Sequence, residues 1–226
     1  MKAMILAAGR GERLRPLTDA TPKPLLEIAG ETLLGRHLER LARAGFTRAV
    51  INVSHLAERI TTRFGDGTRC GLGIDWSHEA EPLESAGGIA QARALLGPAP
   101  FLLLNADIWC DYDFSRLREF GLGKRLAHLV LVPNPPQHSA GDFSLASGIV
   151  GNAPSPRYTY AGIAVLSPQL VAGIAAGEKA PLAPLWRAAA ERGAVSGELY
   201  HGHWSDVGTP ERLARLQAEL QARVKQ

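Results

Sequence analysis

A glycine-rich stretch near residue 10 holds the first side chains that could do chemistry. The apolar run of residues 2–8 predicts a buried strand, and Gly9 and Gly11 follow it directly. Small residues let backbone N–H groups approach an anion closely. Arg13 and Arg15 add fixed positive charge to the same loop. Because ligands of open parallel sheets bind at the carboxyl ends of strands, this loop is predicted to hold phosphates.

Lys23 supplies a further positive charge and lies between Pro22 and Pro24. Two prolines limit φ and remove two N–H donors, so Lys23 is expected on a stiffened, non-helical segment. Such rigidity would benefit a lysine that must meet a phosphate. The glycine spacing matches neither G-x-G-x-x-G nor the Walker motif, so neither a dinucleotide-binding fold nor a P-loop is predicted.

An aspartate follows a second buried strand. The apolar run of residues 101–104 ends at Asn105 and Asp107, which are two residues apart and therefore face the same side. A carboxylate at this edge could hold Mg²⁺, a hard cation that takes oxygen ligands and keeps several waters. Asn105 could reach a ribose or a phosphate. The structural alternative for Asp107 is a helix cap.

These residues need a scaffold, and the sequence alternates strand-like and helix-like segments. That alternation predicts an α/β fold, with a Rossmann-like, mostly parallel central sheet and helices on both faces. We expect one domain over residues 1–226. The predicted strands cover residues 48–53, 72–76, 101–104 and 126–132, and the predicted helices cover 33–41, 56–64, 89–96 and 210–224; residues 133–156 are predicted to form a loop with short strands.

Composition limits the classes of function. The 226 residues carry 25 basic and 22 acidic side chains, a net charge of +3 that is too balanced to indicate nucleic-acid or membrane binding. Cys70 and Cys110 lie in no C-x-x-C motif, which favours reduced thiols. Met1 leads straight into the first strand, and no apolar run approaches about 18 residues. We therefore expect a cytoplasmic protein that binds small molecules.

The segment from Leu6 to Leu25 reads L-A-A-G-x-G-x-R-L-x-P-L-T…P-K-P-L. It resembles the signature of the sugar-1-phosphate nucleotidylyltransferases, which join a sugar phosphate to a nucleoside monophosphate and release pyrophosphate. The resemblance implies that the single domain has a nucleotide-binding part of about 1–110 and a sugar-binding part of about 111–226. It implies that Arg13 and Lys23 are catalytic. It also implies a nucleotide site made by Ala8, Gly9, Gly11, Glu12, Arg13, Lys23, Glu81, Gly87, Gly88 and Asn105.

The same family implies Mg²⁺ as cofactor, bound by Asp107 and by a second aspartate. The segment W-S-D-V-G-T-P resembles the family motif that supplies this second ligand, which places it at Asp206. Thr209 and Pro210 also form a helix start, and both interpretations can hold together. In the base-reading loop the family pattern E-P-L-G-T-A-G is altered, because Glu84 replaces Gly and Ser85 replaces Thr. The alternative for this loop is a helix capped by Ser85.

Sugar-binding positions follow from weaker similarities. G-D-F, with Gly141, takes the place of a family Y-G-V segment, and Y-A-G-I resembles N-A-G-I-Y with Tyr for Asn. An E-K pair before an apolar helix could accept sugar hydroxyls and pair with the sugar phosphate. Each could instead be solvated surface, and Trp204 could fill core. The predicted sugar-binding residues are Gly141, Tyr160, Gly162, Glu178, Lys179 and Trp204.

Within the family, the short chain and its L-E-S-A-G-G-I and G-D-F segments look most like the bacterial N-acetylmuramate-1-phosphate uridylyltransferases of cell-wall sugar recycling. That implies UTP and N-acetylmuramate 1-phosphate as substrates, for a monomer or weak homodimer. Arg157 is one candidate cation for the lactyl carboxylate. A mannose- or glucose-1-phosphate nucleotidylyltransferase using GTP, UTP or dTTP is the alternative. A non-catalytic nucleotide-sugar sensor is disfavoured, because the chain keeps both aspartates, the arginine and the lysine.

Overall fold

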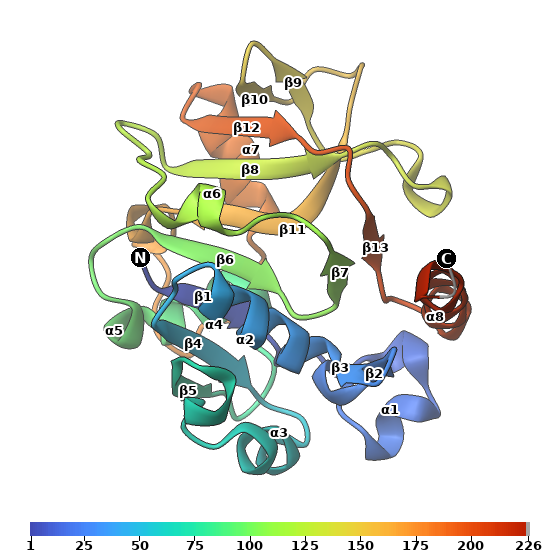
Figure 1. The fold of residues 1–226 in the computed structure, drawn as a ribbon. Coiled ribbons are helices and arrows are strands. Elements are labelled where there is room, and N and C mark those ends of the chain that lie inside the picture. Colours follow the sequence, from blue (N-terminus) through green and yellow to red (C-terminus); the bar gives the residue numbers. More distant parts are fainter. Residues whose placement is uncertain (225–226) are drawn as a thin grey trace.

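A nine-stranded mixed sheet organises residues 1–224, which a computed structural model describes (Figure 1). Pairing directions show that seven of the nine strands, β1 among them, run in one direction, and that β10 and β11 run against them. The strand order is β5 (Gly73–His78), β4 (Arg48–Val53), β1 (Ala3–Leu6), β6 (Phe101–Asn105), β11 (Thr159–Leu166), β8 (Ala127–Val132), β12 (Val195–Leu199), β10 (Ile149–Gly151) and β9 (Ser144–Ala146).

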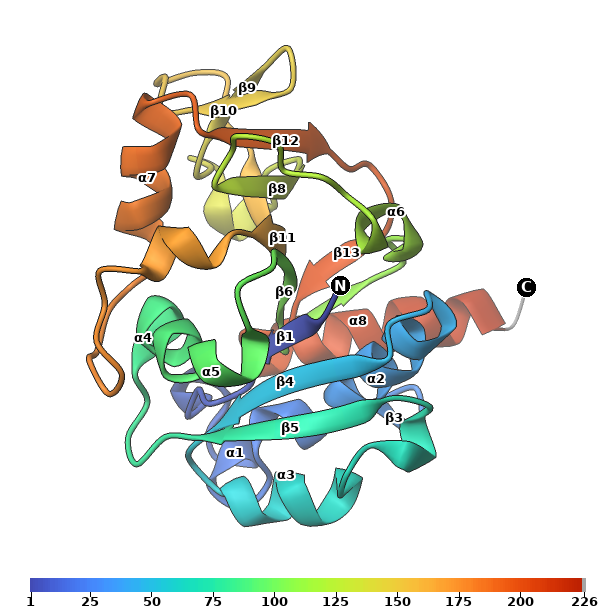
Figure 2. The ribbon, with the colours of Figure 1, turned by 90° about the vertical axis from the view of Figure 1, so that its left-hand side faces the viewer.

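Helices cover both faces of this sheet, because successive strand residues point to opposite sides. Ala3 and Ile5 of β1 belong to one buried cluster and Met4 to another. The first cluster includes α2 (Leu33–Arg43) and α3 (Ala57–Phe64); the second includes α4 (Glu84–Gln91), α5 (Arg93–Leu96) and α7 (Ala183–Glu191) (Figure 2). The predicted fold class is confirmed.

A third, smaller core joins segments far apart in the sequence. Leucines of α8 (Pro210–Val224) pack beside two short ribbons, one formed by β2 (Glu27–Ile28) with β3 (Glu31–Thr32), the other by β7 (Ile108–Cys110) with β13 (Trp204–Asp206). Its buried members are Leu14, Leu26, Ile28, Leu33, Trp109, Val207, Leu213 and Leu216. This core holds the glycine-rich loop against the segment that carries Asp206.

Some local predictions were wrong. Lys23 was predicted on a non-helical segment, but it begins a one-turn 3-10 helix, η2 (Lys23–Leu25). The turn is closed by the N–H groups of Leu25 and Leu26, which donate to the carbonyls of Pro22 at 2.8 Å and of Lys23 at 3.1 Å. The missing N–H of Pro24 therefore breaks no hydrogen bond of the turn. The helix predicted from residue 89 begins at Glu84 and continues as α5.

The remaining short helices are η1 (Glu12–Leu14), α1 (Leu17–Ala20), η3 (Thr68–Cys70), α6 (Ser115–Arg118), η4 (Pro136–His138) and η5 (Pro168–Val171).

Both cysteines are free thiols, as expected, and Cys110 lies in the first core. Burial is the main cause that raises the pKa of the Cys110 thiol. Within residues 1–224, no helix combines the length and apolar character needed to cross a bilayer.

Candidate active site

The carboxyl ends of β1, β4 and β6 meet at one edge of the sheet, because the three strands are parallel neighbours. A cavity of about 880 Å³ opens there. Its lining comes mainly from residues 6–107, and Lys179 and Gly208 join it from the second half of the chain. The predicted site residues that line it are Ala8, Gly9, Gly11, Glu12, Arg13, Lys23, Glu81, Asn105, Asp107 and Lys179.

The two loop glycines serve different purposes. Gly11 has φ of +66°, and a Cβ there would lie 2.9 Å from Thr18 Cγ2, so the loop itself requires glycine. The Thr18 hydroxyl donates to the Gly11 carbonyl at 2.9 Å and fixes the turn. A Cβ on Gly9 would meet no protein atom within 4 Å, although Gly9 lines the cavity. The open space beside Gly9 is available to a ligand that approaches the backbone.

Lys23 points into the same cavity and pairs with Asp107. Its Nζ donates to Asp107 Oδ2 at 2.5 Å, and the side chains are 12% and 35% exposed. Asp107 occupies the turn between β6 and β7, and its carbonyl accepts a hydrogen bond from Val207 N at 2.8 Å. The predicted catalytic lysine and the first predicted metal ligand are therefore direct neighbours.

Strand pairing places Asp206 near Asp107. It ends β13, which runs antiparallel to β7 and sets Asp206 opposite Ile108, the residue after Asp107. Gln137 Nε2 donates to Asp206 Oδ1 at 2.9 Å, and Arg212 forms an ion pair with Oδ2. Thr209 also caps α8, because its Oγ1 accepts from the backbone N–H of Arg212 at 3.4 Å.

The donor set fits Mg²⁺. Asp107 and Asp206 line one smaller cavity of about 280 Å³, and each carboxylate already has a cationic partner. In the described residues 1–224, no cluster of three or more His, Cys, Asp or Glu side chains could hold a metal. Two carboxylates suffice for an ion that usually keeps waters and takes phosphate oxygens as further ligands.

The smaller cavity adjoins the larger one, because Arg13, Asn105 and Asp107 line both. Tyr160, Gly162 and Trp204 line only the smaller cavity. Gly162 has φ of +77° at an irregularity in the pairing of β11 with β8, and a Cβ there would lie 2.8 Å from Ile108 Cγ2. The Trp204 indole donates to the Ala161 carbonyl at 2.7 Å.

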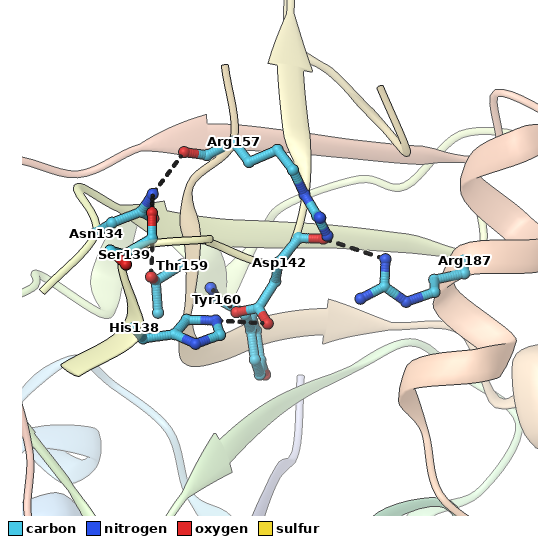
Figure 3. A network of polar contacts seen from close by, with 8 residues as sticks. All are labelled: Asn134, His138, Ser139, Asp142, Arg157, Thr159, Tyr160 and Arg187. Carbon is cyan, nitrogen blue, oxygen red and sulfur yellow. Dashed lines mark hydrogen bonds and ion pairs between the residues drawn. The ribbon is translucent and has the colours of Figure 1, made fainter. Parts of the chain in front are cut away.

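A polar network centred on Asp142 lies beside this cavity (Figure 3), and its members His138, Thr159 and Tyr160 belong to the cavity lining. The Asp142 carboxylate accepts from His138 Nε2 at 3.0 Å and from the Tyr160 backbone N–H at 2.8 Å. Thr159 Oγ1 donates to Asn134 Oδ1 at 2.9 Å. Burial first, and the charge of Asp142 second, raise the pKa of the Tyr160 phenol, which therefore stays neutral.

Four predicted site residues lie outside both cavity linings. The Gly87 N–H donates to the Ala180 carbonyl at 3.1 Å, and a Cβ on Gly88 would lie 2.6 Å from Asn52 Nδ2. Glu178 accepts from the Ala175 N–H at 3.0 Å. Gly141 has φ of +63°, beside the Asn134 amide. All four residues contact other protein groups, and none belongs to either cavity lining.

Ser85 does not cap α4. Its Oγ accepts from the Leu182 backbone N–H at 3.0 Å instead, and the residue before α4 is Leu83, with no side-chain cap. The serine therefore ties the start of α4 to the loop before α7. Because Ser85 also lines the larger cavity, it links a wall of that cavity to the second half of the chain.

The structure adds polar residues that sequence reasoning missed. Asn52 Oδ1 accepts from the Ala7 N–H at 2.9 Å, and Asn52 Nδ2 donates to the buried Glu79 at 2.7 Å. The signal for Asn52 was its place near the carboxyl end of β4, like Asn105 on β6. Arg212 was also missed. It lies three residues after Thr209, its backbone N–H donates to the Thr209 hydroxyl, and its side chain pairs with Asp206.

Comparisons with known proteins identify the family of this chain. Residues 2–147 match the model of the nucleotidyl transferase family, so the chain belongs to that family and is a nucleotidyltransferase. The chain is 48% identical to N-acetylmuramate alpha-1-phosphate uridylyltransferase of Neisseria meningitidis, over 96% of this chain and 97% of that protein.

Two more distant similarities agree with the family. The mannose-1-phosphate guanyltransferase beta-A of Xenopus laevis is 31% identical over 93% of this chain, which spans 62% of that protein. The structure of a UDP-glucose pyrophosphorylase with UDP-glucose has a TM-score of 0.78 at 16% identity, covering 98% of each chain. At that identity the structural match supports the fold alone.

Proposed function

We propose that this enzyme transfers UMP from UTP to N-acetylmuramate 1-phosphate, giving UDP-N-acetylmuramate and pyrophosphate in cell-wall sugar recycling. The observation that carries the proposal is the 48% identity over nearly the whole of both chains with the Neisseria protein of that name. Two adjoining cavities, one beside the glycine-rich loop and one beside β11 and β13, offer room for a nucleotide and a sugar phosphate.

In the proposed reaction a phosphate oxygen of the sugar attacks the α-phosphorus of UTP. A P–O bond forms, the bond to the β-phosphate oxygen breaks, and pyrophosphate leaves with that electron pair. The attacking phosphate is anionic near neutral pH, so no general base is needed. Arg13, which lines both cavities, would hold the departing phosphates, and Lys23 would offset charge at the reacting phosphates.

Asp107 and Asp206 would hold Mg²⁺, which would supply charge neutralisation between the anionic substrates. Asn105 lies where the cavities meet and would orient a phosphate or ribose. Because Gly9 has no side chain, the triphosphate could approach the backbone N–H groups of the loop closely. Tyr160, Gly162 and Trp204 would contact the sugar. A cytoplasmic monomer or weak homodimer completes the proposal.

A turnover panel tests this function. UTP, GTP and dTTP are each combined with the 1-phosphates of N-acetylmuramate, N-acetylglucosamine, mannose and glucose, and pyrophosphate release is measured with Mg²⁺. We expect the highest kcat/KM for UTP with N-acetylmuramate 1-phosphate. Preference for GTP with mannose 1-phosphate would instead support the alternative that the similarity to the Xenopus protein keeps open. Nucleotide binding without pyrophosphate release in any combination would indicate a sensor.

A further inference from the structure

The smaller cavity has a mixed charge lining. Among the described residues that line it, Arg13, His138 and Arg212 can carry positive charge, and Asp107 and Asp206 carry negative charge. Arg13 also lines the nucleotide cavity, where the proposed function assigns it to phosphates. Two side chains, His138 and Arg212, therefore remain as cations for the sugar itself.

His138 is already committed to a partner. Its Nε2 donates to Asp142 Oδ1 at 3.0 Å, and its side chain is 42% exposed. Arg157 and Arg187 do not line the cavity, and both guanidinium groups donate to the Asp142 carbonyl (Figure 3). Arg157, the candidate named from the sequence, therefore contributes nothing to the lining of the smaller cavity.

Arg212 combines a permanent charge with a fixed position. Its Nη1 pairs with Asp206 Oδ2, and its side chain is only 19% exposed. The guanidinium lies against Gly208, where a Cβ would be 3.0 Å from Nη1 and 3.1 Å from Nη2. A guanidinium has five N–H donors, and the contact with Asp206 uses one of its nitrogens. Within residues 1–224 the guanidinium makes no other hydrogen bond, so its remaining donors can bind a second carboxylate in the same cavity.

We propose that Arg212 is a specificity residue that recognises a carboxylate-bearing substituent on the sugar. This inference rests on the proposed function and names the residue that reads the lactyl group, the one feature that separates N-acetylmuramate from N-acetylglucosamine. Asp206 and Gly208 set the guanidinium in place, and its remaining N–H groups donate to the lactyl carboxylate. Fork-shaped pairing with a carboxylate is the interaction that arginine makes best.

The test compares two substrates that differ only in the lactyl ether. For wild type, Arg212→Gln and Arg212→Lys, kcat and KM are measured with UTP and the 1-phosphate of either N-acetylmuramate or N-acetylglucosamine. Calorimetry of the two UDP-sugars, with and without Mg²⁺, gives affinities that do not depend on turnover. His138→Gln is the matched control, because it removes the other cationic side chain.

We expect Arg212→Gln to lower the preference for the lactyl-bearing sugar roughly 10- to 100-fold, mainly through KM, with the same loss in UDP-sugar affinity. Arg212→Lys should restore part of it, and His138→Gln should leave the preference unchanged. Equal losses with both sugars would overturn the inference, because Arg212 would then only support Asp206. If the wild-type enzyme shows the same kcat/KM and the same UDP-sugar affinity with and without the lactyl group, the proposed function itself is refuted.

Discussion

At the scale of single residues, the proposed active site is a set of paired charges. Lys23 meets Asp107, and Arg212 with Gln137 meets both oxygens of Asp206. Each carboxylate that would bind a cation is thus paired with a protein cation. This pairing compensates the charge of two half-buried anions.

Lys23→Ala tests the most central of these charges. We expect the fold to remain, because the Lys23–Asp107 pair lies at a cavity wall, and turnover to fall by about two orders of magnitude or more. Loss of a charge at the reacting phosphates should cost about 3 kcal/mol of transition-state stabilisation. Pyrophosphate release and circular dichroism are the measurements. Arg15→Ala is the control, because Arg15 lies in the same loop, lines neither cavity and pairs with Asp19. Near-normal turnover of Lys23→Ala would contradict its catalytic role.

At the scale of elements, α2 carries an unusual buried residue. Its apolar stripe of Leu34, Leu38 and Leu41 was predictable from helical spacing, and His37 lies in the same buried face at 2% exposure. Burial first, and the positive charge of Arg40 second, lower the pKa of His37 from 6.5 to about 4. The folded state therefore keeps this imidazole neutral where the unfolded chain protonates it.

This pKa predicts a loss of stability in mild acid. Between pH 6.5 and 4 the unfolded state binds one more proton at His37, so the free energy of unfolding falls as pH falls, by roughly 3 kcal/mol across the window. Urea titrations at several pH values measure it. His37→Leu should show a flatter dependence over the same range. Parallel curves for the two proteins would show that other groups cause the acid sensitivity.

The elements also show what the sequence could predict. The edge that brings Lys23 and Asp107 together was predictable, because each strand is a short apolar run with polar residues directly after it. β11 was not, although it places Tyr160 and Gly162 at the site. Its alternation is interrupted by the bulge at Gly162, and its partners β6 and β8 depend on long-range pairing. The contact of Arg212 with Asp206 required the relative placement of β13 and α8.

At the scale of the whole molecule, the third core ties the phosphate loop to α8. Leu14, next to Arg13, is fully buried with Leu213 and Leu216 of that helix. The same helix begins just after the strand that ends at Asp206 and carries Arg212. One small apolar cluster therefore fixes the distance between the proposed triphosphate and sugar subsites.

Leu216→Ala should affect both stability and activity. Leu216 is 1% exposed, and truncating a buried leucine typically costs about 2–5 kcal/mol. We expect a lower Tm together with a lower kcat/KM, because the loop that carries Arg13 loses its packing partner. The exposed neighbour Arg215, which pairs with Glu219, gives the control Arg215→Ala, expected to change stability by about 0.5 kcal/mol or less. A fully active Leu216→Ala protein would argue against the coupling.

The long sequence separation within this third core has a consequence during synthesis. Leu14 leaves the ribosome about 200 residues before Leu216, which at 5–20 residues per second is a delay of roughly 10–40 s. During that time the glycine-rich loop has been synthesised, but α8, against which its Leu14 packs, has not. A growing polypeptide would therefore complete its proposed triphosphate site only after α8 has been synthesised and has packed against Leu14.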